Sequence, residues 1–166
     1  MDDYTRESLR FQAEYAQDKQ LWFGRKELRH ALRRADPAVF QNAMRYLEDD
    51  PYRFGSGYIK QLIWENIRRY ELSQSDVERL RRAALKYLHR PMSREFKPMC
   101  IAMAYLGDVS FWQQVQVATE TDDPRAQVNG NCLLAYEQGV MAGERERMAL
   151  RCAKAWYPHH LRGRGC

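Results

Sequence analysis

Residues 106–115 read Leu-Gly-Asp-Val-Ser-Phe-Trp-Gln-Gln-Val, and residues 122–126 follow with Asp-Asp-Pro-Arg-Ala. An aspartate before a helix caps its free amide groups, and a proline fits the first helical turn because its nitrogen carries no proton. The two stretches therefore predict the starts of two consecutive helices. The second helix carries small and apolar residues at i, i+4, i+7 and i+8, one stripe expected to face inward: Ala126, Gly130, Leu133 and Leu134. A glycine lowers helix stability, so Gly130 predicts a close approach of two helices.

The same helix signals recur on both sides of this unit. Further helix starts are expected at Asp36-Pro37, Asp50-Pro51, Ser73 and Ser93. Helix ends are expected at Gly107 and Gly139. Apolar residues between these signals recur at helical spacing, and no convincing alternating run predicts a strand. The expected helices cover residues 4–17, 20–34, 37–48, 57–70, 75–89, 94–106, 109–120, 124–138 and 142–156.

These helices follow a regular interval. Alternate helices begin at residues 4, 37, 75, 109 and 142, so the period is about 35 residues. Two antiparallel helices in each period predict an α-solenoid, and an irregular helical bundle is the alternative. The expected fold is therefore all-α, a short solenoid of about nine helices. It forms one domain over residues 1–157, and residues 158–166 are expected to be a flexible tail.

The unit at 106–139 resembles the HEAT family, in particular the short HEAT-like repeats of phycobilin lyases. Those repeats show Leu-Gly-Asp, an amphipathic helix, an acidic residue with proline, and a small-residue helix that ends in leucine and glycine. The resemblance covers about 35 residues, and elsewhere only the rhythm of the repeat matches. It implies a helical-repeat fold and a binding role, since HEAT-like repeats serve many unrelated functions. Iron-binding HEAT-like enzymes use His-Glu pairs, and this sequence has no such dipeptide.

Composition limits the classes of protein to consider. The chain has 166 residues, 45% of them hydrophobic, which is enough for one core without metals or disulfides. A net charge of +5 favours acidic partners, although 27 basic residues are interleaved with 22 acidic ones. No apolar run approaches the roughly 18 residues of a membrane helix. The polar N-terminus has no signal-peptide pattern, so we expect a cytoplasmic protein without membrane contact.

Residues suited to catalysis or metal binding are scarce. No phosphate-loop, nucleophile-elbow, zinc-protease or dinucleotide motif occurs. The carboxylate pairs at 2–3, 49–50 and 122–123 are explained by turns and helix caps. The four cysteines form no CxxC pair and are expected to be mainly buried free thiols, and a zinc site or a disulfide framework is the alternative. A metal site at His159, His160 and Cys166 is a further, weaker alternative. We therefore expect no catalytic, cofactor-binding or metal-binding residues, and a protein that is not an enzyme.

Basic residues form ridges along single helix faces. Arg25, Arg29 and Arg33 follow i, i+4 and i+8 spacing, so they share one face. Two further ridges have similar spacing: Arg79, Arg82 and Lys86, and Arg147, Arg151 and Lys154. A ridge of this kind could follow a phosphate backbone, as in DNA glycosylases built from HEAT-like repeats, or it could be a solvated outer face.

A solenoid also offers a concave face. By analogy with HEAT repeats we assign this face to helices 20–34, 57–70, 94–106 and 124–138. Its polar positions are the expected partner-binding residues: Arg29, Arg68, Arg94, Gln127 and Asn131. The leading hypothesis is a non-enzymatic protein-binding module, either an inhibitor or immunity protein or an adaptor, whose partner has an acidic patch. The alternative is a nucleic-acid backbone binder that uses Arg25, Arg29 and Arg33, and a lyase or chaperone-type enzyme ranks last.

Overall fold

The computed structural model describes residues 25–51 and 55–141, and every regular element in these ranges is a helix. The elements are α2 (Arg25–Arg33), α3 (Pro37–Asp49), α4 (Ser56–Asn66), η1 (Ile67–Arg69), α5 (Gln74–Leu85), η2 (Lys86–His89), α6 (Phe96–Leu106), α7 (Val109–Thr119) and α8 (Pro124–Met141). The all-helical prediction is confirmed for this part of the chain. The expected helices 4–17 and 142–156 and the tail 158–166 lie outside the described residues. None of the described helices is both long and apolar enough to cross a membrane.

Four of the expected helix starts carry the caps that the sequence predicts. The Asp36 side chain accepts a hydrogen bond from the Ala38 amide at 3.0 Å, at the start of α3. Ser73 forms a capping box with Asp76 at the start of α5. Asp108 accepts from the Phe111 amide at 2.8 Å, at the start of α7. Asp123 accepts a hydrogen bond from the Arg125 amide at 2.9 Å, at the start of α8. Each side chain satisfies an amide that has no partner inside its own helix.

Other expected boundaries are wrong. Asp50 does not begin a helix but ends α3 in a left-handed conformation, with φ 47°, and α4 begins at Ser56. Ser93 does not cap the next helix, because α6 begins at Phe96. Gly139 lies inside α8, which continues to Met141. The expected helices 57–70 and 75–89 end in the 3-10 turns η1 and η2.

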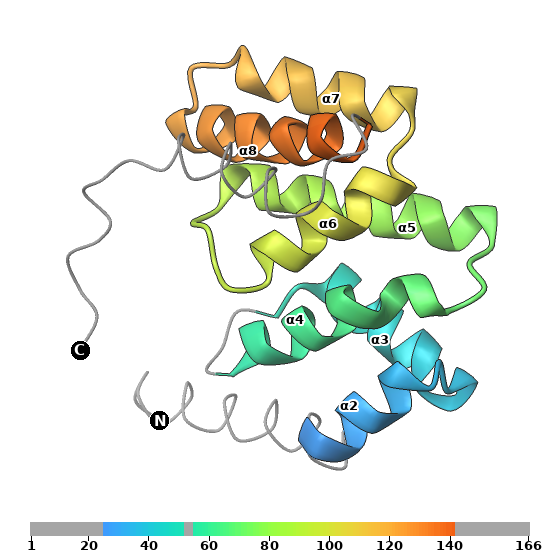
Figure 1. Cartoon of the computed structure of the whole chain (residues 1–166). Helices are drawn as coiled ribbons and strands as arrows, with labels where there is room; N and C mark the ends of the chain where they lie inside the picture. Colours follow the sequence, from blue (N-terminus) through green and yellow to red (C-terminus); the bar gives the residue numbers. More distant parts are fainter. Residues whose placement is uncertain (1–24, 52–54, 142–166) are drawn as a thin grey trace, which may run out of the picture.

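The described helices form two rows (Figure 1). In one row α2 packs against α4, α4 against α6, and α6 against α8. In the other row α3 packs against α5, and α7 packs against α8 of the first row. Helices α4 and α6 therefore lie side by side in the middle of the first row.

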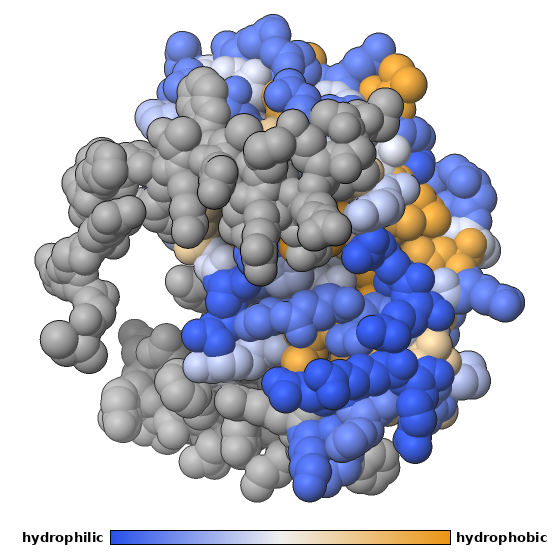
Figure 2. All heavy atoms as spheres, in the orientation of Figure 1, coloured by the Kyte–Doolittle hydropathy of each residue, from blue (hydrophilic) through white to orange (hydrophobic). Residues whose placement is uncertain are grey.

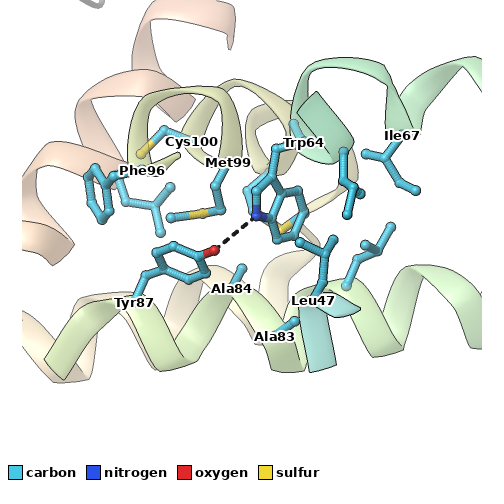
Figure 3. Close-up of a cluster of buried hydrophobic side chains, with 14 of the residues drawn as sticks. Leu47, Trp64, Ile67, Ala83, Ala84, Tyr87, Phe96, Met99 and Cys100 are labelled. Atoms are coloured by element: carbon cyan, nitrogen blue, oxygen red, sulfur yellow. Dashed lines mark hydrogen bonds between the residues drawn. The ribbon is translucent and has the colours of Figure 1, made fainter. Parts of the chain in front are cut away.

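The core fills the space between the rows, and Figure 3 shows its central part. Trp64 of α4 donates a hydrogen bond from Nε1 to the Tyr87 hydroxyl at 3.2 Å, and both side chains are buried. The Tyr87 hydroxyl thus gives the buried indole N–H a hydrogen-bond partner where no water can reach it. Cys100 and Cys132 are buried free thiols, as expected, and burial raises the pKa of the Cys100 thiol.

The contact between α7 and α8 confirms the role expected of Gly130. Gly130 is buried, and a Cβ atom at this position would lie 2.6 Å from Thr119 Cγ2 and 3.3 Å from the Val115 carbonyl oxygen. Ala126 and Leu133 are fully buried on the same stripe, and Leu134 is half-buried against the core. The missing side chain at Gly130 therefore allows the two helices to approach closely.

Candidate functional site

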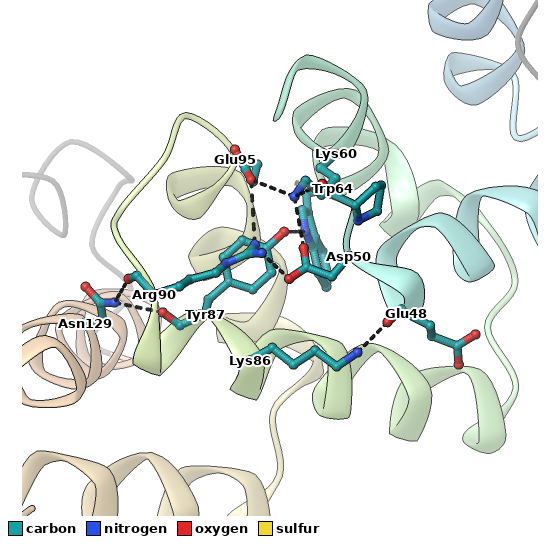
Figure 4. Close-up of polar contacts among 10 residues, drawn as sticks. Glu48, Asp50, Lys60, Trp64, Lys86, Tyr87, Arg90, Glu95 and Asn129 are labelled. Carbon is teal, nitrogen blue, oxygen red and sulfur yellow. Dashed lines mark hydrogen bonds and ion pairs between the residues drawn. The ribbon is translucent and has the colours of Figure 1, made fainter. Parts of the chain in front are cut away.

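A cluster of buried charges joins α3, α4 and α6 (Figure 4). Lys60 of α4 is only 1% exposed, and its Nζ lies 2.9 Å from Asp50 Oδ1 and 3.3 Å from Glu95 Oε1. The same ammonium group donates to the Pro51 carbonyl oxygen at 3.0 Å. An ammonium group removed from water is tolerated only when carboxylates and carbonyls replace the lost solvent. The two carboxylates meet this requirement.

Arg90 completes this cluster from the end of η2. Its guanidinium pairs with Asp50 and lies 3.7 Å from Glu95 Oε1, and its Cζ lies 3.5 Å from the centre of the Tyr87 ring. Asn129 of α8 holds the adjoining backbone, because its Nδ2 donates to the carbonyl oxygens of Tyr87, Leu88 and Arg90 at 2.8, 3.1 and 2.9 Å. We call Asp50, Lys60, Arg90 and Glu95 the buried charge cluster.

The buried charge cluster links distant segments of the fold. It contains two cations and two carboxylates, so its formal charges balance. Lys60 lies in the first half of α4, and Glu95 directly precedes α6. Their contact fixes the N-terminal ends of these helices relative to each other. The surface that α4 and α6 share is therefore held in a defined shape.

That surface carries two exposed pairs of arginine and tyrosine. Arg94, just before α6, lies with its Cζ 3.5 Å from the centre of the Tyr58 ring of α4. Arg68 of η1 lies with its Cζ 4.1 Å from the centre of the Tyr105 ring of α6. Tyr58 is 41% exposed and Tyr105 is 58% exposed, so both pairs face solvent. We call each pair an Arg–Tyr stack, and the surface that holds both the α4–α6 face.

The two Arg–Tyr stacks bridge the same helix pair at opposite ends. One joins the N-terminal ends of α4 and α6, and the other joins their C-terminal ends, so the two helices run in the same direction. At a rise of 1.5 Å per residue, the ten or eleven residues between the ends separate the stacks by about 15 Å. Hydrophilic side chains gather where α4 and η1 lie in Figure 2.

The structure unites only some of the residues that the sequence singles out. Arg68 and Arg94 share the α4–α6 face, whereas Arg29 is exposed on α2. Gln127 and Asn131 lie on α8 and make local bonds: Gln127 donates to the Thr121 carbonyl oxygen at 2.6 Å, and Asn131 to that of Gln127 at 2.8 Å.

The structure describes only part of the first basic ridge, which consists of Arg25, Arg29 and Arg33. Arg29 and Arg33 are exposed on α2. The side chain of Arg25 lies outside the described part of the structure. The ridge of Arg147, Arg151 and Lys154 lies wholly outside it.

The second basic ridge is engaged within the fold. Arg79 of α5 forms a two-fold hydrogen bond with Glu48 of α3, Nε to Oε1 at 2.7 Å and Nη2 to Oε2 at 2.8 Å. This hydrogen bond lowers the pKa of Glu48. Lys86 donates to the Glu48 carbonyl oxygen. Two of its three cations therefore join α5 and η2 to α3 instead of facing a phosphate backbone.

A groove separates α5 and η2 from α7. Its volume is about 520 Å³, and its apolar lining comes from Leu85, Leu88, Val117 and Ala118. His89 lies at its edge, with Nδ1 2.9 Å from Asp123 Oδ2. Among the residues that the structure describes, no three His, Cys, Asp or Glu side chains are grouped to hold a metal ion. Four further polar residues, Ser110, Gln113, Gln114 and Thr121, also line the groove, so its surface is mixed.

The two tyrosines and the buried charge cluster are not among the residues that the sequence singles out for binding. Lys60, Ile63 and Ile67 follow i, i+3 and i+7 spacing, and this spacing was a usable signal, because it places a lysine on an apolar stripe. Tyr58 and Tyr105 carry no comparable signal, since an isolated tyrosine on a helix is as often core as surface.

Comparison of the chain with protein-family models, curated proteins and solved structures gives no match. A role for the α4–α6 face is therefore inferred from its own geometry. Two exposed aromatic rings, each with an arginine held against it, are fixed on one rigid helix pair. Exposed tyrosine and arginine side chains of this kind are common in protein–protein interfaces.

Proposed function

We propose that this protein is a non-enzymatic protein-binding module, an inhibitor or immunity protein or an adaptor, which holds its partner on the α4–α6 face. The observation that carries the proposal is the pair of exposed Arg–Tyr stacks across one helix pair. Tyrosine and arginine are enriched among the residues that dominate the free energy of protein–protein binding. Here they are concentrated on one surface.

Rigidity supports the same proposal. A side chain that is already ordered loses less conformational entropy when a partner binds. Each arginine of the α4–α6 face rests on a ring, and the buried charge cluster ties together the helices beneath. The face is thus formed before a partner arrives.

The two rows of helices support a short HEAT-like solenoid as the architecture that presents this face. Alternate helices contact one another along the row of α2, α4, α6 and α8, and α3 contacts α5 in the other row, which is how a solenoid stacks its repeats. The α4–α6 face belongs to the row assigned from the sequence to the concave side. The free thiols of Cys100 and Cys132 support a cytoplasmic location, where cysteines stay reduced.

Photo-crosslinking in the native cell tests the function. A photoreactive residue at Lys97, which is exposed on α6, should form an adduct with a partner protein. The double variant Tyr58→Ala with Tyr105→Ala should lose the adduct, because it removes both rings. A photoreactive residue at Arg45, which is exposed on α3, is the matched control and should give no such adduct. An adduct that survives the double variant contradicts the assignment of the face.

Nucleic-acid binding is the second candidate, and the exposed arginines of α2, Arg29 and Arg33, favour it. Phosphate contacts release counter-ions, so the affinity of such a complex falls steeply with salt. We expect no binding of DNA or RNA tighter than about micromolar at physiological salt, the background of a basic protein. Sub-micromolar, salt-sensitive binding that Arg29→Glu with Arg33→Glu abolishes would replace the protein-binding proposal.

A further inference from the structure

The stacked arginines keep their hydrogen-bond donors available. A guanidinium is planar, and its N–H groups point outward in the plane. The Cζ atom of Arg94 lies over the Tyr58 ring at 3.5 Å from its centre, and that of Arg68 over the Tyr105 ring at 4.1 Å, distances at which a guanidinium can rest against a ring by its flat side. The edge of each guanidinium can therefore still donate a two-fold hydrogen bond to a carboxylate. No carboxylate of the described residues pairs with Arg68 or Arg94.

The charge around these arginines is one-sided. Between 58–69 and 94–105 the exposed cations are Arg68, Arg69, Arg94 and Lys97. The only exposed carboxylate in these two ranges is Glu65, whose Oε1 already accepts a hydrogen bond from Gln61 at 2.7 Å. The formal charge exposed on these ranges is thus four positive and one negative, a net +3. A ligand that complements this surface is acidic.

We propose that the partner presents an acidic segment in which two carboxylates about 15 Å apart are each bound by one Arg–Tyr stack. This proposal rests on the protein-binding function and names the chemistry of the partner. Each carboxylate accepts a two-fold hydrogen bond from one guanidinium edge, with Arg94 binding one and Arg68 the other. In an extended segment, at roughly 3.3 Å per residue, the two acidic residues are about five positions apart.

Proline-spaced peptides measure this distance directly. A polyproline helix rises about 3.1 Å per residue, so two glutamates with four prolines between them stand about 15 Å apart. Peptides with one and nine prolines place the glutamates about 6 and 31 Å apart. Binding is followed by NMR through the Nε–Hε signals of Arg68 and Arg94. We expect the four-proline peptide to shift both signals with a single dissociation constant, at least about three-fold lower than those of the other peptides.

Charge-matched variants separate this geometry from general attraction. Arg68→Gln or Arg94→Gln should reduce the affinity for the four-proline peptide to that of the one-proline peptide, because only one carboxylate remains bound. Arg45→Gln and Arg125→Gln remove the same charge at exposed positions on α3 and α8, and should leave the affinity unchanged. Arg68→Lys keeps the charge without the fork of donors, so we expect a partial loss. Circular dichroism verifies that each variant is folded.

Several outcomes would overturn the inference. One is an equal affinity for the three peptides, and another is an equal loss of peptide affinity in the control variants. The third is tighter binding of a single-stranded oligonucleotide that depends on Arg68 and Arg94. The cellular crosslink separates this inference from the function on which it rests. A crosslinked partner segment without two acidic residues refutes the acidic-segment proposal and leaves protein binding in place. If no crosslink forms in the cell but peptide binding still depends on the spacing of the glutamates, only the proposed cellular function is refuted.

Discussion

Arginine serves two different purposes in the two rows of helices. In the row of α3 and α5, Arg79 binds Glu48, and Arg81 binds Asp108 at 2.5 Å and the Leu106 carbonyl oxygen at 2.7 Å. On the α4–α6 face, by contrast, arginines rest on tyrosine rings. An arginine whose fork is filled by the protein contributes to the fold. One whose flat side alone is covered keeps its donors for another molecule.

The largest loss of stability is expected when a buried cation of the fold is removed. Lys60→Met leaves Asp50 and Glu95 without their shared ammonium group. We expect a loss of about 3–5 kcal/mol in the free energy of unfolding, since a buried charge loses its partner. Urea denaturation measures it. Lys97→Met, on the exposed side of α6, is the control and should change stability by no more than about 0.5 kcal/mol. Similar losses in both variants would remove the distinction between the two sites.

A second variant removes the hydrogen-bond donor that holds the backbone next to Arg90, and it changes no charge. Asn129→Ala withdraws the donor shared by three carbonyl oxygens at the end of η2. We expect a loss of about 1–3 kcal/mol, the cost of leaving buried polar groups unsatisfied. Asn131→Ala is the matched control, because its side chain bonds only within α8 and should matter by no more than about 0.5 kcal/mol. A thermal melt in which the two variants coincide would contradict the role of Asn129.

The smallest losses of stability are expected when one arginine of each kind is replaced. Arg79→Gln should cost about 0.5–1 kcal/mol at pH 7, because the pair with Glu48 is partly exposed and screened. Arg68→Gln should cost less than about 0.5 kcal/mol. The hydrogen bond from Arg79 lowers the pKa of Glu48 below its usual 4.5. The stability of this pair is therefore present above pH 4.5 and is lost as the pH falls through the lowered pKa in the folded protein.

Denaturation at several pH values measures this difference. The gap in the free energy of unfolding between the native chain and Arg79→Gln should close on acidification, while the small effect of Arg68→Gln stays constant. A gap that persists once Glu48 is protonated would show that Arg79 acts through its packing rather than through its charge.

The sequence predicts those elements whose signals are local. The caps at Asp36 and Ser73 and the close approach at Gly130 each depend on a few adjacent residues, and the structure confirms them. Asp50-Pro51 has the same local signal, but Asp50 binds Lys60 and Arg90 instead of capping a helix. A contact between distant segments decides its role, and no local pattern contains that information.

The sequence predicts the arginines of the candidate site but not its tyrosines. Arg68 and Arg94 follow from the assignment of helices to one face, and the structure places both on the α4–α6 face. Their tyrosines were missed, because the rings come from the neighbouring helix. Residues of a single helix share a face by their spacing, whereas contacts between helices depend on a register that the spacing does not specify.

The left-handed conformation of Asp50 has a consequence for how this sequence can diverge. Positive φ favours glycine or asparagine, but glycine lacks a carboxylate, and asparagine would leave two buried cations against one anion. Asp50 is thus constrained by both backbone and charge, and its two partners, Lys60 and Arg90, come from two other segments. Homologous chains should therefore keep the four charged residues as a set or replace them as a set. Covariation at positions 50, 60, 90 and 95 would identify distant homologues even where little else of the sequence is shared.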